Sequence, residues 1–505
     1  MATLESLCVT SRTATVLLTP DGARFTLPAP IAWRVTEATG AVVATGTAVH
    51  APVFIEDLTP ASDYTFTCDL GSLSITTPAC AGLIDAATFG VNTTANATTN
   101  AAAFARAIAA VPTGGTLTVP AGIYATYPLF LKSDMTLYLP EGAQLAAPET
   151  RHDWPILSAY DDRDRVLGTW EGQPEPCFAA LITAIDAHGL RLTGRGVIDG
   201  GGDRGDWWTW PKETRNGARR PRTIHLAYSD DVHLSGLTVR NSPSWTIHPY
   251  RCDGFWAAAL NIQNPPDSPN TDGLDPESCL DARLVGLDFS VGDDCIAVKA
   301  GKRGDGQSAH LAPTRRLTVS HSRMARGHGA VVLGSEMSGS ITDIDIYACE
   351  FVGTDRGLRL KTRRGRGGEL ARISMRDVLM DGVGTAFSAN AFYFCDIDGK
   401  SDAVQNRAPS PVSETTPIIH DITLDRILAR NVATAAVALL GLPEAPITGV
   451  TLSNFSVGYD PSATEDIPLM ACGVAPVRHG GIIATFADIS GTLTLVEPQK
   501  DHALC

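Results

Sequence analysis

The sequence has no apolar run long enough to cross a membrane and no segment that resembles an export signal. No stretch approaches the roughly 18 consecutive apolar residues that a membrane-spanning helix needs. Glu5 stands where a signal peptide carries Lys or Arg, and no apolar segment follows it. We therefore expect a cytoplasmic protein without a membrane partner. A periplasmic or secreted protein is the alternative if a signal has been removed.

Positive charge and paired cysteines are also scarce. Lys and Arg number 40 against 55 Asp and Glu, so the net charge of −15 leaves no broad basic face for nucleic acid. The 11 cysteines are scattered singly, and none is spaced as CxxC. This pattern predicts reduced, buried thiols, with two or three disulfides as the alternative. We expect neither a metal nor a cofactor, and nothing in the sequence sets the oligomeric state.

One segment is nevertheless strongly basic. Six cations lie within eleven residues: Arg356, Arg359, Lys361, Arg363, Arg364 and Arg366. Glycines at 357, 365, 367 and 368 interrupt any helix, so we expect a loop with a focused positive field. Such a field suits a carboxylated or phosphorylated ligand. For the last three arginines, a solvated surface is the equally weighted alternative.

Residues 1 to about 80 show short alternating strands and no helical period. Strands are expected at 14–18, 31–35, 64–68 and 73–76. Leu58-Thr59-Pro60 followed by Tyr64-Thr65-Phe66 resembles a corner between two strands of a fibronectin type III sandwich. We predict a small β-sandwich of this type at 1–80, a linker at 77–82 and a second domain at 81–505.

The second region begins with one helix and continues as repeated strands. The helix is expected at 99–111, because an alanine-rich apolar face ends before Pro112-Thr113-Gly114-Gly115. Six segments then repeat the same alternation of apolar residues: 231–239, 281–289, 341–349, 370–378, 419–427 and 447–455. Their uneven spacing and the lack of a blade motif argue against a β-propeller. We predict an all-β chain with a right-handed parallel β-helix, whose open end the helix covers.

Four short motifs place ionisable side chains beside small residues. They are Asn270-Thr271-Asp272-Gly273, Gly292-Asp293-Asp294, Gly327-His328-Gly329 and Arg359-Leu360-Lys361. Asp272 and Asp293 are 21 residues apart, about one short coil, and coils stack at roughly 4.8 Å. Crowding raises the pKa of at least one carboxyl, which gives a proton donor beside ionised bases. Glycoside hydrolysis needs this division of roles.

The histidine and the two cations extend the same interpretation. His328 is expected to tune the acid or to hold the attacking water. Arg359 and Lys361 alternate along a strand, so both point to one side and can grip a substrate carboxylate. Each motif alone is a common turn, but all four in this order are hard to attribute to turns.

Together the motifs resemble the signature of the polygalacturonases, glycoside hydrolase family 28, which is NTDG, (G/Q)DD, (G/S)HG and RIK. The one departure is Leu360 in place of isoleucine. The resemblance implies hydrolysis of α-1,4 bonds between galacturonates, with inversion, in a pectic oligosaccharide or polysaccharide. The expected spacing of adjacent coils is shorter than the roughly 6.5–9.5 Å usual between carboxyls of an inverting enzyme. Geometry alone therefore favours retention, whereas the resemblance implies inversion.

The resemblance also assigns roles to residues. It implies that Asp293 protonates the leaving oxygen and that Asp272 and Asp294 together activate water. It further implies that His328 supports the protonation of the acid. The expected substrate-binding residues are Asn270, Lys299, Arg359, Lys361 and Tyr393.

Residues 295–306 and 333–339 resemble the exo-acting bacterial branch of the family, in which a fibronectin-like module precedes the β-helix. Exo action requires that one end of the groove be closed. The expected walls are the insertions at 200–222 and 400–416. For Trp207, Trp208 and Trp210 in the first insertion, stacking on sugar and packing within the loop are equally weighted. Four arginines accompany these tryptophans: Arg215, Arg219, Arg220 and Arg222.

Three alternatives remain open at this point. Within the family, the substrate can be a relative such as rhamnogalacturonan or xylogalacturonan. A calcium-dependent pectate lyase also uses a parallel β-helix, although the histidine and the acidic trio favour hydrolysis. The last alternative is a β-helix that binds carbohydrate without catalysis, which has no need of a complete acid trio.

Overall fold

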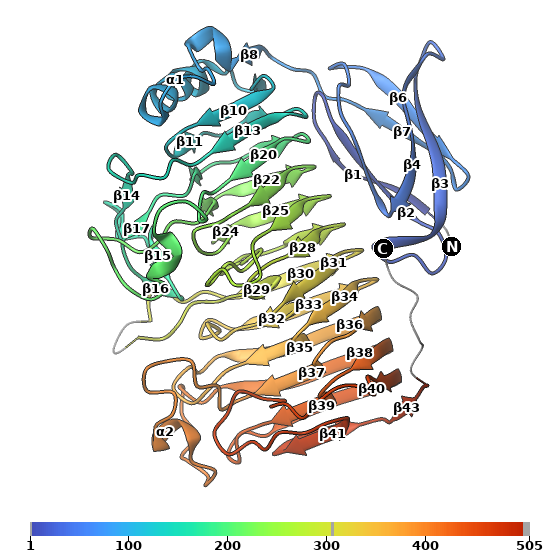
Figure 1. The fold of residues 1–505 in the computed structure, drawn as a ribbon, viewed down its shortest axis with the longest axis vertical. Helices are drawn as coiled ribbons and strands as arrows, with labels where there is room; N and C mark the ends of the chain where they lie inside the picture. Colours follow the sequence, from blue (N-terminus) through green and yellow to red (C-terminus); the bar gives the residue numbers. More distant parts are fainter. Residues whose placement is uncertain (1–2, 305–307, 498–505) are drawn as a thin grey trace.

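The computed structural model describes residues 3–304 and 308–497, which form a small β-sandwich beside a long parallel β-helix (Figure 1). We call residues 3–76 the N-terminal module. It contains a three-stranded antiparallel sheet, ordered β1-β2-β5, and a four-stranded one, ordered β4-β3-β6-β7. The strands are β1 (Thr3–Val9), β2 (Ala14–Thr19), β3 (Thr26–Glu37), β4 (Val42–His50), β5 (Pro52–Ile55), β6 (Asp63–Cys68) and β7 (Gly71–Thr76). The four predicted strands are confirmed.

The corner motif of the module has the expected local geometry. The Thr59 amide donates a hydrogen bond to the Tyr64 hydroxyl at 2.8 Å, as in the tyrosine corner of immunoglobulin-like sandwiches. The predicted linker is held firmly at its start, because Thr77 is buried and its hydroxyl donates to the Thr59 carbonyl at 2.6 Å. The next strand, β8 (Leu83–Asp85), already belongs to the β-helix. The fibronectin-type assignment and the exact boundary stay predictions.

Polar contacts fix the N-terminal module along the side of the β-helix. The Glu350 carboxylate accepts hydrogen bonds from the Thr26 amide and hydroxyl, both at 2.8 Å. At the other end of the interface, the hydroxyls of Thr13 and Thr193 lie 2.8 Å apart. Ala258 of the β-helix packs into the module's own apolar core. The module is therefore docked along the β-helix and does not hang from a flexible tether.

The β-helix is built from three parallel ladders, which confirms the predicted fold class. Two ladders merge into a 22-stranded sheet because several strands run around the corner between them. The first contains β9 (Gly115–Thr118), β12 (Met135–Tyr138), β19 (Arg191–Thr193), β22 (Asp230–Ser235), β25 (Asp253–Ala258), β27 (Arg283–Val285), β30 (Thr314–Ser320), β33 (Ile341–Tyr347), β36 (Glu369–Asp381), β38 (Ile418–Val432), β40 (Ile447–Tyr459) and β42 (Ala487–Ser490). The second contains β10 (Gly122–Ala125), β13 (Ala143–Ala146), β20 (Val197–Asp199), β23 (Thr238–Arg240), β26 (Asn261–Gln263), β28 (Asp288–Ser290), β31 (Arg323–Gly327), β34 (Glu350–Thr354) and β43 (Leu493–Leu495). The six predicted repeats lie on these strands.

The third ladder carries the functional candidates, and we call it the site ladder. Its strands are β11 (Leu129–Leu131), β18 (Ile182–Ile185), β21 (Ile224–Ala227), β24 (Ile247–Tyr250), β29 (Ile296–Val298), β32 (Val331–Leu333), β35 (Arg356–Lys361), β37 (Thr385–Asn390), β39 (Ala435–Leu440) and β41 (Gly480–Thr485). Single bridges through Leu274 connect β24 to β29. Ile247, Leu274 and Ile296 are in register and fully buried, so this row faces the core. Because strand positions alternate, the residues on either side of the row face outward.

A helix closes the first coil, as predicted. Helix α1 (Ala97–Ala110) begins two residues earlier than expected, where the Asn96 side chain accepts a hydrogen bond from the Thr99 amide at 2.8 Å. Its buried residues Phe104 and Ile108 face the β-helix, and α1 lies across the top of the coil in Figure 1. In the described part of the chain, no helix is both long enough and apolar enough to span a membrane.

The remaining short elements lie in the loops between coils. They are the single-turn segments η1 (Ala86–Phe89) and η2 (Trp207–Thr209), helix α2 (Asp402–Gln405), and the strands β14 (Ile156–Leu157), β15 (Thr169–Trp170), β16 (Gln173–Pro174) and β17 (Cys177–Phe178). The ten cysteines within the described residues are free thiols, and most are buried. Cys505 lies outside the described residues, as do residues 305 and 306 of the segment that resembles the exo-acting branch.

The expected loop begins only after Lys361, and one of the two equally weighted alternatives for the last three arginines is excluded. Residues 356–361 form strand β35 rather than a loop. The last three arginines are not a solvated surface either, because each bonds a carboxylate: Arg363 pairs with Asp398, Arg364 with Glu444 and Arg366 with Asp396. These pairs tie the loop after β35 to neighbouring loops. The positive charge therefore has a structural function there, and only the cations on the strand are left for a ligand.

Candidate active site

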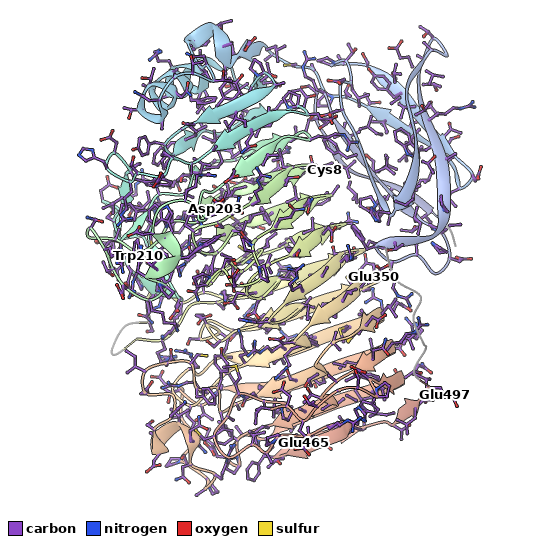
Figure 2. All side chains as sticks on the ribbon, viewed as in Figure 1. Cys8, Asp203, Trp210, Glu350, Glu465 and Glu497 are labelled. Carbon is purple, nitrogen blue, oxygen red and sulfur yellow. The ribbon has the colours of Figure 1, made fainter. Side chains whose placement is uncertain are left out.

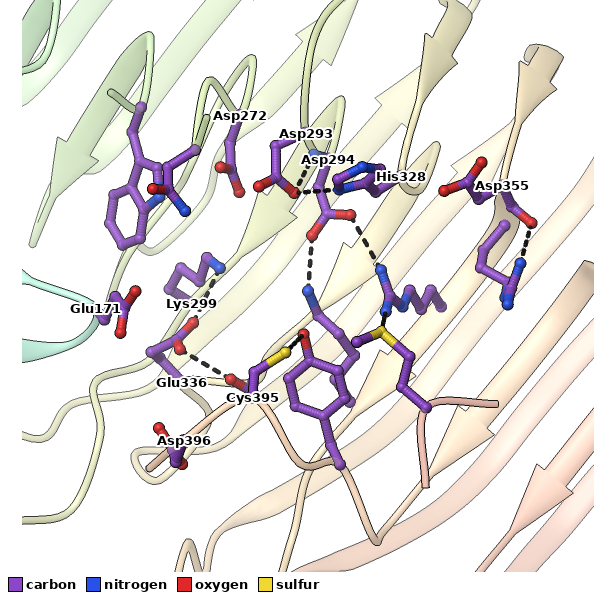
Figure 3. A pocket seen from close by; sticks show the side chains of 18 of the residues that line it. Glu171, Asp272, Asp293, Asp294, Lys299, His328, Glu336, Asp355, Cys395 and Asp396 are labelled. Atoms are coloured by element: carbon purple, nitrogen blue, oxygen red, sulfur yellow. Dashed lines mark hydrogen bonds and ion pairs between the residues drawn. The ribbon is translucent and has the colours of Figure 1, made fainter. Parts of the chain in front are cut away.

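All nine predicted site residues line one pocket of about 440 Å³ on the site ladder (Figure 3). Ten further residues complete the lining: Glu171, Lys212, Trp245, Ser335, Glu336, Asp355, Arg356, Cys395, Asp396 and Met470. None of the lining residues belongs to the described part of the N-terminal module. In Figure 2, Cys8 of the module and Trp210 of the insertion at 200–222 lie toward opposite sides of the β-helix.

Three carboxylates converge at the centre of the pocket. Asp272 lies in the turn before the Leu274 bridge, and Asp293 and Asp294 lie in the turn before β29. One oxygen from each of the three carboxylates lies within 4.8 Å of the other two. Glycine permits this approach: a Cβ on Gly329 would lie 2.4 Å from Val332 Cγ2 and 3.1 Å from Asp294 Oδ1. The small residues of the motifs are therefore needed for adjacent coils to bring the acids together.

Asp294 is held in its ionised form by two cations from β35. Lys361 Nζ lies 2.7 Å from Asp294 Oδ2, and Arg359 Nη1 lies 3.5 Å from Oδ1. Burial alone would raise the pKa of Asp294, but Lys361 and Arg359 outweigh it and lower the pKa to about 2. Asp294 therefore remains a carboxylate throughout the neutral range. The two cations also lie within 6 Å of the Tyr393 ring, which restricts their movement.

Asp272 and Asp293 have different surroundings. Burial raises the pKa of Asp272 well above its ordinary value, and the nearby charge of Asp293 raises it further. Asp293 is partly exposed, and its Oδ1 accepts from the Asp294 amide at 2.9 Å. His328 Nδ1 lies 3.2 Å from the same oxygen, and this hydrogen bond raises the pKa of His328 to about 9. His328 therefore carries a proton at neutral pH and donates it in the hydrogen bond to Asp293.

The raised pKa of His328 predicts a pH-dependent contribution to stability. Histidine has an ordinary pKa of about 6.5, and the folded value is about 9. The pair therefore stabilises the fold fully below about pH 6.5, and the contribution is lost as the pH rises through about 9. His328→Asn should lower the melting temperature near pH 6 and have little effect near pH 10, in thermal melts across this range.

The size of this effect should be small, because the side chain of His328 is 55% exposed. His152→Asn is the matched control, since that side chain is 91% exposed in a surface loop. A melting-temperature difference for His328→Asn that stays constant from pH 6 to pH 10 would contradict the prediction.

Within the described residues, the acid trio is the cluster of carboxylates that lie close enough together to hold a cation. Hard divalent cations take several carboxylate oxygens. Here, however, Lys361 and Arg359 already neutralise Asp294. A divalent ion would have to compete with both cations, so the electrostatics favour acid–base chemistry over metal ligation. The calcium-dependent lyase is therefore a poor fit to this site.

A second charge pair forms the floor of the pocket. Lys299 Nζ lies 2.9 Å from Glu336 Oε2 and 5.1 Å from the centre of the Trp245 ring. Burial opposes the charge on Lys299, but Glu336 and Asp272 together raise its pKa well above the usual value. Lys299 therefore adds a permanent cation on the other side of the acid trio from Arg359. Trp245 and Glu336 were not predicted, because neither stands in a motif.

The insertion at 200–222 does contribute to the pocket, but not through its tryptophans. Trp207 and Trp210 are buried against each other, with ring centroids 5.7 Å apart, and Trp208 donates to the Ser242 carbonyl at 3.0 Å. Stacking of sugar on Trp207 or Trp210 is therefore excluded. The same insertion supplies Lys212, which pairs at 3.4 Å with Glu171 across the pocket edge.

The arginines of this insertion have structural partners. Arg220 is fully buried and donates to the Asn270 side chain at 2.5 Å and to the Pro243 carbonyl at 2.7 Å. Asn270 adopts a left-handed backbone conformation (φ 57°), which asparagine tolerates. Arg220 therefore fixes the turn that carries the motif Asn270-Thr271-Asp272-Gly273. The sequence did not predict this role, because Arg220 lies in an insertion.

The insertion at 400–416 does not line the pocket, contrary to the prediction. Its residue Gln405 accepts from the Cys472 amide at 2.9 Å, and Arg407 donates to the Cys472 carbonyl at 2.8 Å. These bonds support the segment that carries Met470. Met470 does line the pocket, where its sulfur accepts a hydrogen bond from Arg359 at 2.9 Å. The wall on this side is thus made by 393–396 and Met470.

Comparisons with known proteins agree with this geometry. The family model described as "Glycosyl hydrolases family 28" matches residues 167–472. A probable polygalacturonase of Vitis vinifera is 32% identical over 342 residues, which is 66% of each chain. This chain spans 66% of the length of the Vitis vinifera protein, and 55% of the length of the polygalacturonases of Juniperus ashei and Chamaecyparis obtusa.

Two solved structures share the fold. One is a hyperthermoactive exopolygalacturonase from Thermotoga maritima, with a TM-score of 0.67, 21% identity and coverage of 82% of this chain and 92% of that one. The other is a family 28 exopolygalacturonase from Yersinia enterocolitica, with a TM-score of 0.65, 20% identity and coverage of 98% of both chains. At this identity, the likeness concerns the fold alone.

Proposed function

The chain belongs to glycosyl hydrolase family 28, and on this basis we propose that it hydrolyses α-1,4-galacturonosidic bonds of polygalacturonate or oligogalacturonides. The observation that carries the proposal is the pocket in which three carboxylates face permanent cations. The carboxylates supply acid and base groups, and the cations suit a uronate. A neutral sugar would have no group to match Arg359, Lys361 and Lys299.

The proposed roles follow from the different surroundings of the three acids. Asp293 donates a proton to the glycosidic oxygen as the bond from that oxygen to C1 breaks. His328 carries a proton at neutral pH, 3.2 Å from Asp293, and passing this proton to Asp293 lets Asp293 act as the acid. Asp294 and the ionised form of Asp272 take the proton of the water that attacks C1. The proton taken from the water is then released to solvent and His328 takes up one proton in exchange, so each turnover leaves the proton balance of the site unchanged.

We propose inversion at C1, as the family resemblance implies. The carboxylate oxygens lie within 4.8 Å, closer than the roughly 6.5–9.5 Å usual for inverting enzymes. In the proposed mechanism, Asp272 and Asp294 act on the water together. A single distance between one acid and one base therefore does not describe the site.

We further propose exo action, in which the pocket accepts only a chain end. Lys212 and Glu171 stand on one side of the pocket, and the segment 393–396 and Met470 stand on the other. All of these residues lie in loops outside the regular coils. A pocket bounded by loops in this way favours one or two sugar units beyond the cleaved bond over a long open groove.

A single time course on trigalacturonate and polygalacturonate tests the proposal. Monomer or dimer should be the first product from both substrates, with no series of intermediate sizes, in a chromatographic product profile. In the same reaction, proton NMR should show the β-anomer as the first reducing end, because water attacks opposite the leaving oxygen. A ladder of sizes would contradict exo action, and an α-anomer would contradict inversion. Ultraviolet absorbance of an unsaturated product would contradict hydrolysis itself.

A further inference from the structure

A layer of buried ionisable groups lies beneath the floor of the pocket. Asp275 is its most unusual member. The side chain is fully buried, and within the described residues neither carboxylate oxygen has a hydrogen-bond partner. Such a group is costly unless something compensates for it, and most buried carboxyls are hydrogen-bonded. The mechanism proposed above does not use Asp275.

The register of the site ladder places Asp275 on the pocket side of the sheet. Leu274 pairs with Ile247 and Ile296, and this row faces the core. The following positions, which include Asp275, therefore face the opposite side. Three rungs further along, the same row contains Arg359, which lines the pocket. Asp275 thus belongs to the pocket face, but it is covered.

Charged groups surround Asp275 from every neighbouring element. Asp272 belongs to its own turn, Lys299 follows β29, and Arg222 precedes β21, with Asp294 farther away. Burial raises the pKa of Asp275 well above its usual value, and Asp272 raises it further, whereas Lys299 and Arg222 act in the other direction.

The remaining neighbours in the layer are neutral or paired with each other. His248 follows Ile247 in the same row, and burial lowers its pKa well below the usual value. Its Nε2 lies 2.9 Å from Glu277 Oε2. Above this layer, the Trp245 ring packs edge-on against His248 with centroids 5.1 Å apart. Lys299 is therefore the cation that Asp272 and Asp275 have in common on this side of the pocket.

We propose that Asp272 and Asp275 hold one proton between them, which makes Asp275 a positioning residue for the water-activating carboxyl. Asp275 is fully buried and Asp272 is exposed only where it lines the pocket, and the positive charge of Lys299 acts on both. Glu336 already neutralises Lys299, so both carboxyls ionised would add two negative charges to the same buried space, whereas both protonated would leave Asp272 unable to accept a proton from water. When Asp275 carries the proton, Asp272 is ionised and can accept a proton from water. The proposal rests on the function proposed above.

The variant Asp275→Asn tests this sharing, because its amide keeps the shape of a protonated carboxyl and cannot ionise. Asp272 then no longer competes for the proton, so the acidic limb of the kcat/KM profile should move to lower pH by about one unit. The value of kcat at the optimum should stay within about tenfold, because Asp275 does not touch the reacting atoms. Asp288→Asn is the control, since burial also raises the pKa of that carboxyl but it lies outside the pocket.

A second measurement does not depend on any substrate. Carboxyl ¹³C NMR titration of aspartate-labelled protein should show Asp272 titrating at lower pH in Asp275→Asn than in the wild type. The reverse variant, Asp272→Asn, should lower the pH at which Asp275 titrates. Unchanged titrations, or loss of melting temperature with an unchanged pH profile, would overturn the proposal. If the coupled titrations appear but galacturonides are not cleaved, the proton sharing stands and the proposed substrate fails.

Discussion

Asp293→Asn should reduce the release of reducing ends from polygalacturonate by about 10²–10⁴-fold, since a positioned general acid contributes on that order. The amide cannot supply a proton to the leaving oxygen. It also removes the negative charge that holds the proton on His328, at 3.2 Å from Asp293. The loss should appear in kcat more than in KM, because the sugar contacts of the pocket remain.

Two controls make this result specific. Asp355→Asn removes another carboxyl that lines the same pocket. Asp355 does not belong to the acid trio, so activity should change little. The melting temperature of Asp293→Asn should stay close to that of the wild type, because the side chain is partly exposed. Full activity in Asp293→Asn would instead favour a β-helix that binds carbohydrate without catalysis.

Lys361→Met should lower kcat/KM by about 10²–10³-fold, the usual cost of removing one electrostatic contact in a buried active site. The ammonium lies 2.7 Å from Asp294 and is itself buried. Without it, burial raises the pKa of Asp294, because Arg359 at 3.5 Å is the weaker partner. Asp294 then becomes protonated at a higher pH, so the acidic limb of the pH–rate profile should move upward.

The matched variant is Arg364→Met, which breaks the ion pair with Glu444 at 2.6 Å outside the pocket. Both variants should lower the melting temperature, because each leaves a carboxylate with fewer partners. Only Lys361→Met should shift the pH–rate profile. A similar loss of activity in both variants would mean that Lys361 acts through stability alone.

The sequence was sufficient to predict the β-helix and the members of the acid trio. Alternating apolar residues specify an inward row, and the spacing of 21 residues between Asp272 and Asp293 matches one coil. The structure confirms that these two acids and Asp294 meet. The helix at 99–111 was also predicted to within two residues, because its composition is local information.

The walls of the pocket could not be predicted in the same way. Lys212 and Met470 reach the pocket through loops whose paths depend on packing against other loops. The tryptophans at 207 and 210 have the composition of a sugar platform, yet the loop buries them. The arginines after β35 likewise pair with acids that lie 30 to 80 residues further along the chain. A sequence pattern does not contain such distant partners.

The motifs also did not predict the ion pairs within the site. Alternation on β35 correctly put Arg359 and Lys361 on one side, but it did not show that both already bond Asp294. The prediction that they grip a substrate carboxylate stays a proposal. In the structure they also keep one acid of the trio ionised, which a motif cannot indicate.

We expect the docked N-terminal module to stiffen the part of the β-helix that carries the site. A solenoid is held together only by contacts between successive coils, so small changes in stacking can accumulate along its axis. Here the module is tied to β19 through Thr13 and Thr193, and to β34 through Thr26 and Glu350. The coils that carry Asp272, Asp293 and His328 lie between these two ties. Two fixed contacts on either side of these coils should limit changes in their stacking, although none of the described module residues lines the pocket.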